Sequence, residues 1–346
     1  MQQQTQQTIN LSVTTAEDAE LLGRCETIMG RLADGPGGDP LGDIVGHHLG
    51  TGGKRLRARL ALLTAETLGS SKETVVPWAA ACELLHNATL VHDDLQDGDK
   101  QRRGEPAVWV KYGAAQAINT GDLMLILPYQ AIAELETTAE NKWALTDILS
   151  HYALTTVRGQ ALEFTLMEKA RNGSLRASFK EAIEGKTSAL FQAPVHGAAI
   201  LSGQTLHEAQ QTAEPFRYLG QLFQYQDDVL DLYGNKGREK AGMDLKEGKV
   251  SSLVVEHLAH HPDDSQWLLT ALEKPREETS DEEVERAIQS FREGGALGHV
   301  LSQITSLETT LKQSDVLTHH PGLGRLVQSF VELILHPIRH VLDAEQ

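Results

Sequence analysis

Helical periodicity over most of the chain constrains its fold more than any other feature. Apolar residues recur every three or four positions in long segments such as "VVPWAAACELLHNATLVHDDL" and "TLHEAQQTAEPFRYLGQLFQYQDDVLDLYG". Breakers rich in glycine and proline, such as "DGPGGDPLG" and "RRGEPAV", separate these segments. The sequence shows neither an alternating strand pattern nor a fixed-period repeat. We therefore predict an all-α protein with about ten or more helices in one domain.

The same periodicity predicts where the folded part begins. Residues 1–15 are polar and rich in Gln and Thr, so we expect a disordered arm there and a single domain over residues 16–346. Pro128, Pro194 and Pro337 fall inside helical segments, where we expect kinks or breaks.

The charge of the chain limits its partners. The 346 residues include 31 Lys and Arg against 48 Asp and Glu, a formal net charge of −17. We therefore expect no nucleic-acid partner, and an anionic ligand would need a local concentration of cations. No apolar run reaches the ~18 residues of a transmembrane helix, and the polar start does not resemble a secretory signal. Cys25 and Cys82 lack zinc or disulfide spacing, so we expect a cytoplasmic protein.

Two aspartate clusters with the same spacing carry the strongest chemical signal. Each ends an apolar helical segment and places carboxylates at positions i, i+1 and i+4, on one helix face. One such cluster is more often a solvated helix end, but two in one helical chain require cations to offset the repulsion. Oxygen-only ligands favour Mg²⁺, which usually also binds phosphate oxygens. The clusters are Asp93, Asp94 and Asp97, and Asp227, Asp228 and Asp231.

Basic residues flank these clusters along the sequence. Any one of them alone would be read as a solvated surface residue, but together they predict two bound polyanions. One polyanion would be held through Mg²⁺ and the other directly by Lys and Arg. A P-loop nucleotide site is not supported, because the sequence contains no GxxxxGK[ST] motif. The basic residues are Lys54, Arg55, Arg57, Arg102, Arg103, Lys186, Lys240 and Lys249.

These motifs, in this order, resemble the trans-isoprenyl diphosphate synthases (the polyprenyl synthetase family), most closely the short-chain geranylgeranyl and farnesyl diphosphate synthases. The resemblance extends from about Gly52 to Lys249 and rests on "GGKRLR", "ELLH", "DDLQD", "RRG", "GQALE", "GKT", "FQYQDD", "DDVLD", "KAGMD" and "EGK". It implies a single-domain orthogonal helical bundle of the isoprenoid synthase type around a central cavity. It also implies a homodimer, packed through "NTGDLMLILPYQAIAEL" near the first cluster.

The resemblance assigns a role to each matching residue. Metal ligation, of about three Mg²⁺ ions, falls on Asp93, Asp97, Asp227, Asp228 and Asp231. Substrate binding falls on Lys54, Arg57, His86, Arg102, Arg103, Lys186, Thr187, Gln224, Lys240 and Lys249. Catalytic roles fall on Asp93, Asp94, Asp97, Arg102, Lys186, Asp227 and Lys240. Phe223 and Asp244 also match family positions, and Glu163 of "GQALE" stands where the family has Asp, so the charge is kept.

The implied reaction joins isopentenyl diphosphate to an allylic diphosphate, head to tail and in trans. Mg²⁺ on the aspartates would neutralise the leaving diphosphate. Arg102, Lys186 and Lys240 would add positive charge where negative charge grows. The released diphosphate would remove the proton, so no side-chain base is required.

The length of the product depends on the residues that precede the first cluster. Ala88 and Thr89, five and four positions before Asp93, are both small, whereas aromatic residues there give the short farnesyl product in the resembled family. Leu85 and Met124 are the candidates that would stop further growth, although ordinary core positions look the same. We predict geranylgeranyl diphosphate as the product, with farnesyl and longer polyprenyl diphosphates as alternatives.

Three other readings remain open. A class I terpene cyclase would use similar metal-assisted ionisation, but it does not need the "GGKR", "RRG" and "EGK" motifs. A non-catalytic subunit of a hetero-oligomeric synthase would be expected to lose one aspartate cluster, and this chain keeps both. A purely structural helical protein leaves the clustered carboxylates unexplained.

Overall fold

The structure is a computed structural model that describes residues 15–35, 37, 39–172, 174–234 and 241–345. Most of the expected N-terminal arm, residues 1–14, lies outside the described residues. The chain forms two compact units. We call Ser12–Ala153 with Leu190–Glu214 the N-terminal unit, and Leu154–Ala189 with Pro215–Gln346 the C-terminal unit. That residues 16–346 fold as one domain stays a prediction.

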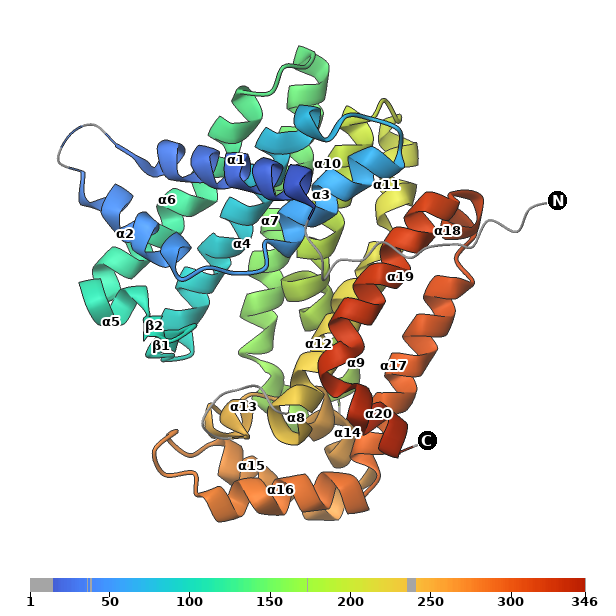
Figure 1. The fold of residues 1–346 in the computed structure, drawn as a ribbon. Coiled ribbons are helices and arrows are strands. Elements are labelled where there is room, and N and C mark those ends of the chain that lie inside the picture. The colour runs from blue at the N-terminus through green and yellow to red at the C-terminus, as the bar shows by residue number, and fades with distance from the viewer. Residues whose placement is uncertain (1–14, 36, 38, 173, 235–240, 346) are drawn as a thin grey trace. The chain divides into compact units, whose positions relative to one another are not determined.

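Nearly all regular structure is helical, as the periodicity predicts (Figure 1). The elements of the N-terminal unit are α1 (Ala16–Ala33), α2 (Pro40–Gly50), α3 (Leu56–Thr67), η1 (Lys72–Val75), α4 (Val76–Gln96), β1 (Gln101–Arg102), β2 (Glu105–Pro106), α5 (Val108–Tyr112), α6 (Ala114–Ala133), the first part of α7 (Ala139–Glu163), most of α10 (Ala189–Leu201) and α11 (Leu206–Ala213).

The C-terminal unit contains the rest of α7 and the elements that follow α7 and α11 in sequence. These are α8 (Leu166–Asn172), α9 (Leu175–Ile183), the π-helical turn η2 (Glu184–Ser188), α12 (Phe216–Tyr233), α13 (Met243–Lys246), α14 (Ser252–His260), η3 (Pro262–Asp264), α15 (Ser265–Leu272), α16 (Asp281–Glu293), α17 (Ala296–Lys312), α18 (Asp315–His319), α19 (Pro321–Leu335), η4 (His336–Ile338) and α20 (Arg339–Ala344).

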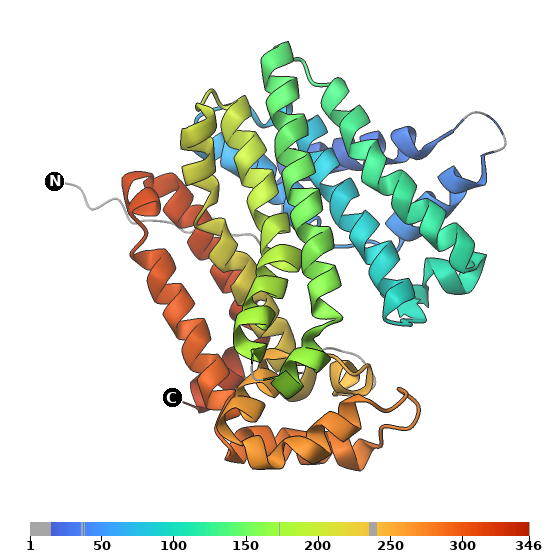
Figure 2. The ribbon, with the colours of Figure 1, turned by 180° about the vertical axis from the view of Figure 1, so that it is seen from behind.

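Helix α4 is the core helix of the N-terminal unit. It packs against α6, α3 and α1, and α4 and α6 lie side by side in both views (Figures 1 and 2). Trp78 on α4 is fully buried, and its indole Nε1 donates a hydrogen bond to the carbonyl oxygen of Pro194, at 3.0 Å. This bond satisfies the polar atom of the largest buried side chain. The unit therefore holds α4, which ends in the first aspartate cluster, by contacts along its length.

Helix α12 is likewise the core helix of the C-terminal unit. It packs against η2, α17 and α19, and α14 packs against α17. Phe216, Phe291 and Phe330 are fully buried in this core. The second aspartate cluster thus also ends a core helix.

Of the three prolines at which we predicted kinks or breaks, only Pro337 lies at the end of a helix. Helices α6 and α10 continue through Pro128 and Pro194. At Pro337, however, α19 has ended and a short 3₁₀ turn, η4, takes its place. The hairpin of β1 and β2, with Arg103 and Gly104 at positive φ in its turn, was not expected, because two-residue strands are too short to show alternation.

Candidate active site

The first aspartate cluster lies at the C-terminal end of α4. Asp94 is buried, and the guanidinium of Arg102 donates to its carboxylate, with Nε at 2.8 Å from Oδ1 and 3.0 Å from Oδ2. Burial raises the pKa of Asp94, and the bonds from Arg102 oppose that rise. Asp93 and Asp97 are only half-buried. The cluster thus contains one buried and two half-buried carboxylates.

The "RRG" hairpin meets the "GGKR" loop in the same unit. Arg103 donates from Nη1 to the carbonyl oxygen of Gly52. Gly53 has φ +139°, and a methyl group added there would lie 2.7 Å from Arg103 Nη1. Only glycine therefore allows both this backbone conformation and the approach of the guanidinium. Two motifs that are about fifty residues apart in sequence form one loop cluster.

Arg57 is buried at the start of α3. Its backbone amide and that of Ala58 donate to the Glu83 Oε1 atom at 2.9 and 3.1 Å, so a carboxylate from α4 caps α3. The Arg57 guanidinium lies over the Phe191 ring, 4.7 Å from its centroid. Burial lowers the pKa of Arg57 to about 10, so the side chain still carries its charge at neutral pH.

His86 lies within a group of positive charges. Burial and then the charges of Arg57, Arg102 and Arg103 hold its pKa well below the usual value, so the imidazole is neutral. Its buried Nδ1 atom has no hydrogen-bond partner among the described residues. Burial and the neighbouring Arg102 and Arg55 likewise lower the pKa of Arg103. Positive charges packed this closely in an acidic protein form a site suited to an anion.

Two further predicted basic residues, Arg55 and Lys54, belong to the "GGKR" loop itself. Arg55, at φ 49°, turns to Glu26, with Nε 2.8 Å from Oε1, and its guanidinium also donates to the carbonyl oxygens of Leu49 and Gly52. Arg55 therefore shapes the loop. Lys54 is exposed.

The second aspartate cluster, on α12, has two buried carboxylates where the first has one. Asp228 is buried, and its two oxygens accept hydrogen bonds from Gln224 Nε2 at 2.9 Å and from the Ser252 backbone amide at 2.7 Å. Burial raises the pKa of Asp228 to about 6. Asp231 is also buried and accepts from the Asp244 amide at 3.2 Å, whereas Asp227 is half-buried.

A hydrogen-bond chain joins three of the predicted motifs in the C-terminal unit. Thr187 Oγ1 donates to Gln224 Oε1 at 3.1 Å, and Gln224 in turn donates to Asp228. The "GKT" turn, the "FQYQ" stretch and the second aspartate cluster are therefore one connected network. Phe223, next to Gln224 on α12, is half-buried.

The π-helical turn η2 presents Lys186 to the "GQALE" motif. Lys186 Nζ lies 2.5 Å from Glu163 Oε2. Gly159 makes this approach possible, because a methyl group added there would lie 2.6 Å from the backbone carbon of Gly185. Glu163 thus still meets a lysine although the resembled family has the shorter Asp there.

The stretch after the second cluster is described only from Ala241. Lys240 lies outside the described residues. Lys249 Nζ is 2.8 Å from Glu247 Oε2, and Arg276 Nη2 is 3.1 Å from Glu247 Oε1. Glu247 therefore links two cations, a role that the sequence did not reveal.

The proposed chain-length residues lie in the N-terminal unit. Ala88 and Leu85 on α4 and Met124 on α6 are fully buried. Thr89 is half-buried, and its hydroxyl donates to the His86 carbonyl oxygen at 2.7 Å. Since α4 and α6 pack against each other, these residues belong to the packed face beneath the first cluster.

The sequence did not reveal three residues that contact and orient the predicted site residues. Glu83 caps α3, Ser252 binds Asp228 through its amide, and Glu247 links Lys249 and Arg276. Only Glu83 gave a signal, since a carboxylate inside the apolar run "AAACELLH" needs a partner.

Comparison with known proteins shows the family of the chain. The polyprenyl synthetase family matches residues 39–291. The geranylgeranyl diphosphate synthase of Methanosarcina mazei is 34% identical over 288 residues, 80% of this chain and 84% of that protein. The octaprenyl diphosphate synthase of Escherichia coli is 32% identical over 227 residues, 64% of this chain and 68% of that protein.

A solved structure confirms the predicted fold class. The crystal structure of a geranylgeranyl pyrophosphate synthase matches with a TM-score of 0.81 at 25% sequence identity, covering 92% of this chain and 98% of that one. No helix among the described residues combines the length and the apolarity needed to cross a membrane.

Proposed function

Because the chain belongs to the polyprenyl synthetase family and is a trans-isoprenyl diphosphate synthase family enzyme, we propose that it joins isopentenyl diphosphate to an allylic diphosphate and releases geranylgeranyl diphosphate. One observation carries the proposal. Arg57, Arg102, Arg103 and the neutral His86 gather beside an aspartate cluster in a chain of net charge −17. A cyclase, which binds one diphosphate, does not require this second set of cations.

The carboxylates fit Mg²⁺. In each cluster the middle residue, Asp94 or Asp228, is buried and bonded within the protein, while Asp93, Asp97 and Asp227 are more open. These three side chains would ligate the ions, and the buried Asp228 and Asp231, which accept from the Ser252 and Asp244 amides, would contribute from the second cluster. When bound, Mg²⁺ supplies positive charge to the leaving diphosphate and so favours its ionisation.

The protein's own cations hold the diphosphates in place. Asp94 orients the guanidinium of Arg102 through both carboxylate oxygens, and we assign Arg102 to the allylic diphosphate. Glu163 fixes Lys186 in the same way on the side of the second cluster. Pre-oriented cations stabilise growing negative charge without reorganising during the reaction.

Isopentenyl diphosphate would be bound by the "GGKR" loop cluster. Arg103 is fixed there against Gly52, Arg57 is fixed by Phe191, and Lys54 is exposed and able to reach a ligand. His86 is neutral and so keeps one N–H donor for a phosphate oxygen. For Lys249 and Lys240 the role in binding a diphosphate stays a prediction from the family resemblance, with Lys240 assigned to the leaving diphosphate.

We base the proposed product length on the small residues that precede the first cluster on α4. The growing chain would pass Ala88 and Thr89, and Leu85 or Met124 would stop it at twenty carbons. The 34% identity to a geranylgeranyl diphosphate synthase agrees with this product, but relatives that make farnesyl and octaprenyl diphosphate are also similar to this chain.

The function can be tested by incubating the purified chain with Mg²⁺, labelled isopentenyl diphosphate and, separately, dimethylallyl, geranyl or farnesyl diphosphate. The products are dephosphorylated and sized. We expect one labelled alcohol, geranylgeraniol, from all three. A farnesol or longer end product would overturn only the chain length, whereas hydrocarbon made from an allylic diphosphate alone would establish the cyclase reading.

We also propose a homodimer and a cytoplasmic location. Ile118 and Ile126 on α6 and Val110 on α5 are large exposed apolar side chains, which a second copy would cover. Light scattering on the eluting protein tests the dimer. Cys25 and Cys82 are buried free thiols, as in proteins of a reducing compartment.

A further inference from the structure

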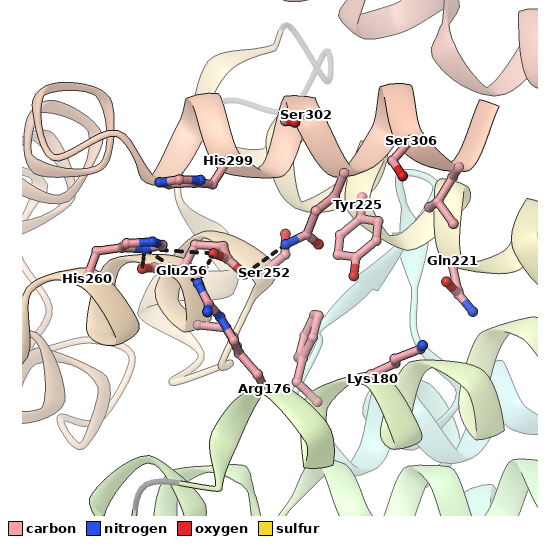
Figure 3. Close-up of a pocket in the computed structure, with 14 residues that line it drawn as sticks. Arg176, Lys180, Gln221, Tyr225, Ser252, Glu256, His260, His299, Ser302 and Ser306 are labelled. Atoms are coloured by element: carbon pink, nitrogen blue, oxygen red, sulfur yellow. Dashed lines mark hydrogen bonds and ion pairs between the residues drawn. The ribbon is translucent and has the colours of Figure 1, made fainter. Parts of the chain in front are cut away.

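The C-terminal unit contains a pocket of about 560 Å³ that the proposed condensation does not use. Helices α9, α12, α14 and α17 line it (Figure 3). At one end, Glu256 and His260 from α14 meet His299 from α17, with one ligand atom of each residue within 4.8 Å of the others. We propose that these three side chains bind a transition-metal ion, which we take to be Zn²⁺.

The spacing on α14 allows two of its residues to bind the same metal ion. Glu256 and His260 are four residues apart, which places them one turn apart on the same helix face. Because α14 packs against α17, His299 completes the group from the opposite helix. Figure 3 shows the two imidazoles lying one over the other beside the carboxylate.

Neighbouring groups already orient two of the ligands. Gln303 Nε2 donates to Glu256 Oε1 at 2.8 Å. His260 Nδ1 lies 2.8 Å from the Glu256 carbonyl oxygen, so Nδ1 carries the proton and Nε2 keeps its lone pair for a metal. Such outer hydrogen bonds are typical of ligating histidines, because they fix the tautomer and the ring orientation.

The third ligand needs only a side-chain rotation. The rings of His260 and His299 are parallel, with centroids 4.0 Å apart and planes 4° apart. An ion lies in the plane of each imidazole that binds it, so the rings must turn toward each other. The terminal torsion of histidine has a broad minimum, and both side chains are exposed, so this rotation costs little.

Arg176 now occupies the place that the ion would take beside Glu256. Its Nη2 atom is 2.5 Å from Glu256 Oε2, and about half of its side chain is exposed. The buried carboxylate needs a cation, and a metal ion would replace the guanidinium, which can move into solvent. Two imidazoles and one carboxylate favour Zn²⁺ or its neighbours over Mg²⁺, which prefers oxygen ligands.

The test is a zinc titration of the full-length protein against a chromophoric chelator, in millimolar Mg²⁺ to occupy the oxygen-ligand sites. We expect one zinc site per chain, weakened at least about tenfold in His260→Ala and in His299→Ala. The matched control is His319→Ala. His319 is exposed and its Nδ1 lies 2.7 Å from the carbonyl oxygen four residues earlier, as in His260. Equal binding by the wild type and the His260→Ala/His299→Ala double variant would overturn the proposal.

A second variant tests whether Glu256 is a ligand. Arg176→Gln removes the competing cation and keeps a polar side chain, so zinc should bind several-fold more tightly. Unchanged or weaker binding would contradict ligation by Glu256. The condensation assay in Mg²⁺ reads the proposed function separately, and His299→Ala should leave it unchanged.

Discussion

At the scale of single residues, the carboxylates of the two clusters differ in how deeply they are buried. Asp94 and Asp228 are buried and bonded to Arg102 and to Gln224 and Ser252. Such hydrogen bonds fix the orientation of a carboxylate, and carboxylates that bind metal ions are usually held in this way. The spacing DDxxD therefore predicts the face of the cluster, but the burial of each member is seen only in the structure.

Loss of the half-buried first carboxylate of either cluster, Asp93 or Asp227, should sharply lower turnover. Asp93→Ala and Asp227→Ala are each expected to lower kcat by at least about a hundredfold, because each removes a proposed metal ligand. Steady-state kinetics with isopentenyl and farnesyl diphosphate measures the effect, and far-UV circular dichroism checks the fold. The exposed Glu136→Ala is the control and should match the wild type. Near-wild-type rates in Asp93→Ala or Asp227→Ala would refute the assignment.

Ala88 should set the product length. Ala88→Phe adds an aromatic ring at a fully buried position of α4, so the product should shorten from geranylgeranyl to farnesyl diphosphate. Product sizing measures the change. Thr89→Ser keeps the hydroxyl that donates to the His86 carbonyl and should leave the product as it is. If Ala88→Phe makes the wild-type product, the growing chain does not pass this residue.

At the scale of elements, the π-helical turn η2 is what brings Lys186 to Glu163. The turn fits against α7 because two glycines meet, with a Cβ built on Gly185 only 2.7 Å from the Gly159 Cα. Such turns widen a helix by one residue and are frequent at functional sites. Helical periodicity does not reveal them, because the sequence pattern on either side is unchanged.

A methyl group at Gly159 should therefore separate η2 from α7. Gly159→Ala is expected to lower the free energy of unfolding by about 3 kcal/mol, since the backbone of Gly185 cannot yield as a side chain would. Gly298→Ala is a matched control in the same unit, because no atom lies within 4 Å of its Cβ position in α17. This control should be about 1 kcal/mol more stable than the wild type. Equal stabilities for the two variants in urea denaturation would contradict the packing account.

At the scale of the whole molecule, buried neutral histidines make stability depend on pH. Burial, the foremost cause for each, lowers the pKa of His48 to about 3 and that of His196 to about 4, and it also lowers the pKa of His86. The unfolded chain takes up protons below about pH 6.5, whereas the folded chain does not. These residues therefore stabilise the fold above pH 6.5, and that contribution is lost as the pH falls.

The free energy of unfolding should fall by roughly 1 kcal/mol per buried histidine between pH 6.5 and 5.5. Asp228, whose pKa is raised to about 6, takes up its proton more readily in the folded state and so adds stability as the pH falls. Because this is one group against three histidines, the free energy of unfolding should still fall. Urea denaturation of the metal-free protein at pH 7.5, 6.5 and 5.5 measures it. His48→Gln should reduce the pH dependence of the free energy of unfolding by the uptake of about one proton, and His319→Gln should leave it unchanged. Stability that rises toward pH 5.5 would contradict the account.

Much of this molecule is predictable from its sequence, and the remainder has identifiable causes. Helices and the two clusters follow from local spacing, as in Asp93 and Asp97. The cap of α3 by Glu83 and the amide of Ser252 on Asp228 join residues more than twenty positions apart, so no local pattern shows them. The role of Arg102 was predicted, but its bidentate bond to Asp94 depends on a two-residue hairpin that periodicity cannot detect.

The central claim is that the enzyme joins isopentenyl diphosphate to an allylic diphosphate. The most direct test measures the release of inorganic diphosphate with and without isopentenyl diphosphate. A coupled pyrophosphatase assay follows release from farnesyl diphosphate in Mg²⁺. We predict that release requires isopentenyl diphosphate and that one diphosphate appears for each isopentenyl unit incorporated. Comparable release from farnesyl diphosphate alone would contradict the account, because only one diphosphate would then be needed at the site.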